Sequence, residues 1–98
     1  MVDPGGSGAT RWMPLARHVG WPSYTLDTLA VIILRESGGR PDAHNQSGAS
    51  GLMQLMPGWW MGTWGMPAGN PYDPHYNLST SFSMWKRNGW HPWALTAY

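Results

Sequence analysis

The chain has 98 residues, six basic and five acidic side chains, a formal net charge of +1 and no cysteine. Its length is that of one small domain, and the lack of cysteine excludes disulfides and thiolate metal sites. Charged residues make up only 11% of the sequence, against roughly 25% in an average domain. The cations are scattered rather than gathered in a basic stripe, so we expect no nucleic-acid binding.

The N-terminal ten residues are rich in glycine and have neither a basic start nor an apolar run. Residues 1–10 are therefore predicted to form a flexible lead-in rather than a signal peptide, with the folded domain at 11–98. The longest apolar run, Leu29–Leu34, is far too short to span a bilayer. If the substrate lies outside the cytoplasm, something else must deliver the protein.

Two helices are predicted in the first half of the chain. A short one covers Met13–Val19 and is stopped by Gly20. The strongest covers Ser23–Ser37, with Ser23 as its N-cap and the pair Gly38–Gly39 supplying the left-handed residue that ends helices.

The segment that follows is rich in turn-forming residues. A short helix is predicted over Ser50–Met56, ended by Pro57, and a small hairpin around Asn45–Gly51 stays open as an alternative. A loop follows over Gly58–Pro74.

A further helix is predicted over Asn77–Arg87, with Asn77 as N-cap, although Asp73 before Pro74 is also expected to cap it. A last helix begins near Pro92. The fold class predicted is mostly α, with little or no strand.

Glu36 continues the apolar stripe of the strongest helix. Leu26, Leu29 and Ile33 follow one another at helical spacing, and Glu36 is the next step. An acid is unfavourable at a helix C-terminus, where the macrodipole is negative. The position therefore indicates a functional acid; the alternative is an exposed glutamate of the last turn.

Three segments, in fixed order, carry a wider pattern. They read ESGGRPDA at residues 36–43, GASGLMQLMP at 48–57 and WALTAY at 93–98, with DPHYNL at 73–78 before the last. They resemble the glutamate–serine, glycine–leucine–methionine–glutamine and alanine–tyrosine motifs of the soluble lytic transglycosylases. Gln54 follows Glu36 by 18 residues, as in that pattern. The resemblance covers residues 12–98, although the asparagine and glycine that normally follow the tyrosine are not present after Tyr98.

The resemblance implies a lysozyme-like helical fold related to goose-type lysozyme. It implies cleavage of the β-1,4 bond between N-acetylmuramic acid and N-acetylglucosamine in peptidoglycan, without a cofactor. We accordingly expect a monomer that acts on glycan strands at the bacterial cell wall, in the periplasm, outside the cell or delivered by a phage.

The chemistry needs an acid that keeps its proton near neutral pH. Burial raises the pKa of a carboxyl group, and a helix C-terminus acts in the same direction, so Glu36 suits this role. A hydrolase normally needs two carboxyl groups, and Asp42 is the only reasonable second candidate. A single convincing acid favours the lytic reaction, which yields 1,6-anhydromuramic ends. The alternatives are a muramidase that hydrolyses the same bond and a non-catalytic wall-binding module.

The resemblance also implies substrate-binding residues around the acid: Ser37, Ser50, Met53, Gln54 and Tyr98. Ser37 has the alternative of a plain helix-end serine. Eight tryptophans stand beside one phenylalanine; most should fill the core, and Trp59, Trp60 or Trp64 are expected at the rim of a cleft whose floor holds a largely buried Glu36. The four histidines lack metal-ligand spacing, and no metal is expected.

Overall fold

The computed structural model describes residues 8–60, 62 and 67–94. Within these ranges the chain is built of helices joined by turns, with no named strand, which confirms the mostly α prediction. The helical elements, in chain order, are η2 (Thr10–Trp12), α1 (Met13–Val19), η3 (Ser23–Thr25), α2 (Leu26–Ser37), α3 (Pro57–Trp60), α4 (Pro74–Asn88) and η4 (His91–Trp93).

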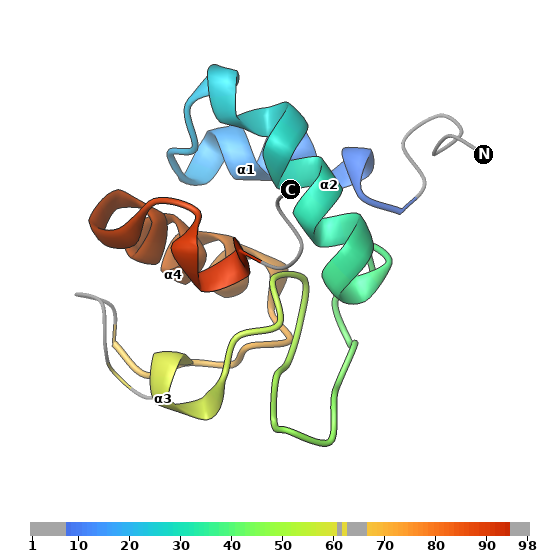
Figure 1. Cartoon of the computed structure of the whole chain (residues 1–98), viewed down its shortest axis with the longest axis vertical. Coiled ribbons are helices and arrows are strands. Elements are labelled where there is room, and N and C mark those ends of the chain that lie inside the picture. The colour runs from blue at the N-terminus through green and yellow to red at the C-terminus, as the bar shows by residue number, and fades with distance from the viewer. Residues whose placement is uncertain (1–7, 61, 63–66, 95–98) are drawn as a thin grey trace.

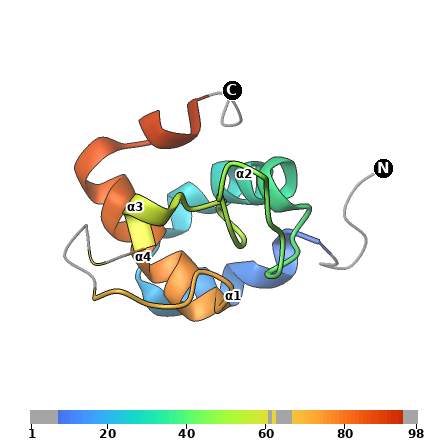
Figure 2. The same ribbon diagram turned by 90° about the horizontal axis from the view of Figure 1, so that it is seen from below.

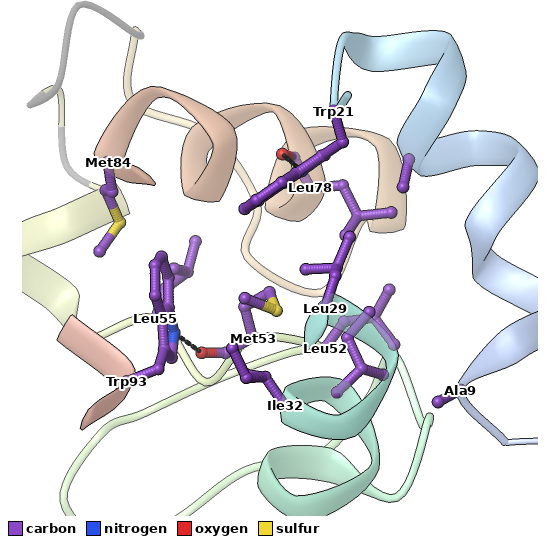
Figure 3. Packing of buried hydrophobic residues seen from close by; sticks show 12 residues of the cluster. Ala9, Trp21, Leu29, Ile32, Leu52, Met53, Leu55, Leu78, Met84 and Trp93 are labelled. Atoms are coloured by element: carbon purple, nitrogen blue, oxygen red, sulfur yellow. Dashed lines mark hydrogen bonds between the residues drawn. The ribbon is translucent and has the colours of Figure 1, made fainter. Parts of the chain in front are cut away.

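The helices enclose one apolar core. α1 lies against α4 and also contacts α2 (Figures 1 and 2). The long connection between α2 and α3, green to yellow in Figure 1, returns to this core. Figure 3 shows its side chains meeting those of α2 and α4. The buried cluster consists of Ala9, Ala16, Trp21, Leu29, Ile32, Ile33, Leu52, Met53, Leu55, Leu78, Met84 and Trp93.

The two N-terminal helices follow their local signals closely. α1 has the predicted bounds and ends at Gly20. Gly38 ends α2 with φ 65°, and its N–H donates to the Leu34 carbonyl at 2.9 Å, which confirms the predicted left-handed stop. The start of the helix differs, because Ser23 opens a tight 3-10 turn instead of capping an α-helix. That turn is held by the Thr25 hydroxyl and N–H, which both donate to the Pro22 carbonyl.

Asp73, not Asn77, caps α4. The Asp73 carboxylate accepts a hydrogen bond of 3.0 Å from the His75 N–H, and Pro74 occupies the start of the helix. The prediction for Asp73 is confirmed and that for Asn77 is wrong. Asn77 lies within the helix and is fully buried. The helix ends at Asn88, one residue beyond the predicted end, and Gly89 is its C-cap.

Residues 50–56 form turns rather than the predicted helix. Ser50 and Leu55 exchange both backbone hydrogen bonds, at 3.0 and 2.9 Å. Between them, Gly51 and Gln54 have φ of 80° and 50°, outside the right-handed helical region. Isolated antiparallel bridges join Ser50 to both His44 and Leu55, so the hairpin alternative is nearer to the structure. α3 begins at Pro57, the residue predicted to end a helix.

The predicted lead-in falls mostly on residues 1–7, which lie outside the described part of the chain. Ala9, near its end, is buried in the core. The Arg11 guanidinium and the Trp12 indole N–H both donate to the Gly39 carbonyl, at 3.2 and 2.7 Å. Near the other end, η4 occupies the position where a last helix was predicted. In the described ranges, no helix is both long and apolar enough to cross a membrane.

A pair of glycine substitutions tests the turn at Gly51. Both Gly51 and Gly38 have positive φ, so alanine at either position should cost about 1–2 kcal/mol. A Cβ at Gly38 meets nothing within 4 Å, whereas at Gly51 it collides with the Pro71 carbonyl and the Asn77 amide. We expect Gly51→Ala to exceed the Gly38→Ala penalty by about 1–3 kcal/mol, measured by denaturant unfolding. Equal penalties would contradict this close approach.

Candidate active site

Glu36 lies on the last turn of α2, at the edge of the contact between this helix and residues 50–55, here called the motif loop. It follows Ile32 by four residues and Ile33 by three, so it shares their face of the helix. Both isoleucines are fully buried, in one cluster with Leu52 and Met53. Figure 3 shows Ile32 beside these two residues. Glu36 itself is partly buried, with most of its surface covered.

The hydroxyl of Ser37 closes the end of the Glu36 helix. It donates to the Ile33 carbonyl at 3.0 Å and accepts from the Gly39 N–H at 3.2 Å. The side chain is buried, with 7% of its surface exposed. These bonds hold the backbone immediately after Glu36 in a fixed conformation.

A series of backbone hydrogen bonds connects the end of α2 to the motif loop. The Arg40 N–H donates to the Ser37 carbonyl and the Ala43 N–H to the Arg40 carbonyl, each at 3.2 Å. The Gly51 N–H in turn donates to the Ala43 carbonyl at 2.8 Å. Three of the expected site segments, those of Glu36, Ser50 and Gln54, therefore belong to one hydrogen-bonded unit.

Ser50 is buried beneath two polar side chains, those of His44 and Tyr72, which the sequence did not link to it. Its Oγ donates to the Gly48 carbonyl at 2.9 Å and lies 3.2 Å from the Tyr72 hydroxyl and 3.3 Å from His44 Nδ1. The Tyr72 hydroxyl is 3.0 Å from the same histidine nitrogen. His44 and Tyr72 are both exposed at the surface. No spacing rule links them, because 28 residues separate the two.

Met53 is held in the core by side chain and backbone. The side chain has no exposed surface. Its N–H donates to Asn77 Oδ1 at 3.0 Å. Its carbonyl accepts from the Trp93 indole, also at 3.0 Å (Figure 3). Asn77 and Trp93 were not among the predicted site residues, since a spacing of 24 or 40 residues carries no local signal.

Gln54 is partly buried and has an unusual backbone. Among the described residues other than glycine, it alone has positive φ, at 50°. Its Nε2 donates to the carbonyls of Gly51 and Ala43, at 3.0 and 3.2 Å. Both partners are acceptors, so the NH2 group of the amide must face them and Oε1 must face away.

The remaining expected site residues are Tyr98 and the three tryptophans of the loop. Tyr98 and Trp64 lie outside the described residues. Trp59 and Trp60 are partly buried against the core, and Trp59 meets the edge of Trp93 at a ring separation of 6.5 Å. The cleft expected from the sequence is not found, because the residues that the structure describes enclose no pocket.

The acids and histidines of the described segments are dispersed. Asp42 is exposed on the turn after α2. Across residues 8–60, 62 and 67–94, no three His, Asp or Glu side chains are grouped so that they could hold a metal ion.

Comparison with protein families identifies the class to which this site belongs. The sequence model of the family described as "Transglycosylase SLT domain" matches residues 22–89, which include Glu36, the motif loop and α4. The chain belongs to this family.

Similar proteins include the "Probable transglycosylase IsaA" of Staphylococcus aureus strains Newman, Mu3 / ATCC 700698 and MW2. Each is 46% identical to this chain over 55 residues, which cover 56% of the chain and 22% of the relative. The chain thus spans about a fifth of the length of these relatives.

The left-handed conformation of Gln54 can be tested by comparing two substitutions. Gln54→Ala and Gln54→Gly both remove the side-chain hydrogen bonds, but only alanine keeps the steric penalty of positive φ. We expect the glycine variant to be more stable by about 0.5–1 kcal/mol, after allowance for the larger chain entropy of unfolded glycine. Denaturant unfolding measures the difference.

Arg35, exposed in α2, provides the control. There the order should reverse, with alanine up to about 1 kcal/mol more stable than glycine, because residue 35 is part of an α-helix. An alanine preference at both positions would contradict a left-handed Gln54.

Proposed function

We propose that residues 11–98 form a catalytic domain that cleaves the β-1,4 bond between N-acetylmuramic acid and N-acetylglucosamine in peptidoglycan, by lytic transglycosylation. The observation that carries this function is the position of Glu36. In a chain of the transglycosylase SLT family, an acid ends the helix face that packs on the motif loop. We expect the domain to act as a monomer at the bacterial cell wall.

Glu36 acts first as acid and then as base. Its carboxyl proton goes to the glycosidic oxygen as the bond from that oxygen to C1 of the muramic residue breaks. The carboxylate then removes the proton of the 6-hydroxyl on the same muramic residue, whose oxygen bonds to C1. The substrate's acetamido group stabilises the intermediate. No water is consumed, and the product has a 1,6-anhydro end.

The other site residues bind or position the glycan. The motif loop supports binding through Ser50 and Gln54, with Gln54 Oε1 available as an acceptor. Met53 contributes by fixing the loop, since its side chain is fully buried. Ser37 keeps the end of α2 rigid beside the acid. Tyr98 contacts the sugar next to Glu36.

Replacing the acid tests the catalytic role. Glu36→Gln keeps the size and hydrogen-bonding capacity of the side chain but cannot transfer a proton, so lysis of purified cell walls should fall by at least ~10²-fold. Asp42→Asn makes the same change on an exposed carboxylate six residues away and should leave most activity. Clearing of wall turbidity measures both. Near wild-type clearing by Glu36→Gln would refute the assignment.

Product analysis distinguishes the lytic reaction from its alternatives. Mass spectrometry of digested peptidoglycan should find 1,6-anhydromuramic ends, which lack the water that hydrolysis adds. Reducing muramic ends, together with a deep loss of activity in Asp42→Asn, would instead establish a two-carboxylate muramidase. Wall binding without any cleavage would establish the non-catalytic module.

A further inference from the structure

The backbone of Met53 is held from both sides by residues distant in sequence. Its N–H donates to Asn77 Oδ1 of α4 at 3.0 Å. Its carbonyl accepts from the indole N–H of Trp93 in η4, also at 3.0 Å (Figure 3). Asn77 is fully buried and Trp93 is 2% exposed. Residues of α4 and η4 therefore fix both backbone polar groups of Met53, its N–H and its carbonyl.

The Asn77 amide has no spare donor for a ligand. Its Nδ2 donates to the Ser50 carbonyl at 3.2 Å and to the Pro71 carbonyl at 2.9 Å. With Oδ1 on Met53, both hydrogens and the oxygen of the amide are engaged. A fully buried side chain in this state acts on the loop rather than on a substrate.

Asn77 and Trp93 together form a clamp on the backbone of Met53. The residue whose conformation this clamp constrains is Gln54, which directly follows Met53. A residue other than glycine rarely adopts positive φ, and it persists there only where the surrounding structure imposes it. With φ at 50°, Gln54 can direct Nε2 back to the carbonyls of Gly51 and Ala43, so that Oε1 faces away from them. Orientation of this acceptor thus depends on the backbone of Met53.

We propose that Asn77 and Trp93 are positioning residues of the active site, which clamp Met53 so that Gln54 Oε1 is presented as a hydrogen-bond acceptor to the glycan. The acceptor suits an acetamido N–H or a hydroxyl group of the sugar. This assignment rests on the proposed function. Neither residue touches the substrate, and both act through the motif loop.

Two tryptophan substitutions provide a matched test. Trp93→Phe and Trp21→Phe each remove one buried indole N–H bond of 3.0 Å to a backbone carbonyl, that of Met53 in the first case and that of Leu78 in the second. Both side chains are at most 2% exposed. The two variants should lose similar thermal stability, but only Trp93→Phe loosens the motif loop.

Two measurements separate positioning from a structural effect. Nitrogen-edited NMR should show the Gln54 side-chain amide signals displaced in Trp93→Phe and unchanged in Trp21→Phe. Well below both melting temperatures, kcat/KM on peptidoglycan should fall at least about tenfold in Trp93→Phe, because a misplaced binding group weakens the transition-state complex. Trp21→Phe should stay within about twofold.

Asn77→Ala is the direct variant, but it removes three buried hydrogen bonds to the backbone at once and can fail to fold. The comparison of Trp93→Phe with Trp21→Phe is therefore the decisive test. Equal behaviour of the two variants in both measurements overturns the clamp. If the wild-type domain cleaves no glycan but the Gln54 signals move only in Trp93→Phe, the clamp is supported and the proposed function is overturned.

Discussion

The rest of the structure depends on where the buried amide of Asn77 finds its hydrogen-bond partners. An amide without partners in the core would strongly destabilise a domain of this size. Its three hydrogen bonds reach Met53, Ser50 and Pro71. The start of α4, the chain that leads into it and the motif loop must therefore meet at one point, and few arrangements of the helices allow this.

This constraint overrides the local preference of the motif loop. Leu52, Met53 and Leu55 suit a helix, but the turn directs the Met53 N–H to Asn77 Oδ1 and lets Ser50 and Leu55 exchange both backbone hydrogen bonds. The turn instead buries all three side chains against α2 and α4. It requires positive φ at Gly51 and Gln54, and a Cβ on Gly51 would collide with Asn77 itself. Glycine at position 51 is thus explained by its positive φ and by the close approach of the Pro71 carbonyl and the Asn77 amide.

Features encoded over a few neighbouring residues could be predicted from the sequence, and those that depend on distant contacts could not. The stop of α2 at Gly38, the Asp73 cap and the position of Glu36 at the end of an apolar stripe all follow from local periodicity and turn chemistry. Asn77 was misread because asparagine favours helix caps. Its actual partner on the motif loop lies 24 residues away, and no periodic pattern reaches that far.

Tryptophan side chains link distant parts of the chain in this domain, as disulfides do in other small domains. All seven tryptophans in the described ranges belong to the core or pack against it. Three of them also donate their indole N–H to a carbonyl of a distant element: Trp12 to Gly39, Trp21 to Leu78 and Trp93 to Met53. The indole ring packs in or against the core, and its N–H binds a backbone carbonyl of another element. Each such tryptophan therefore fixes the position of that element as well as burying apolar surface. In a chain without cysteine, these bonds hold the residues just after α2, the first half of α4 and the motif loop to elements distant in sequence.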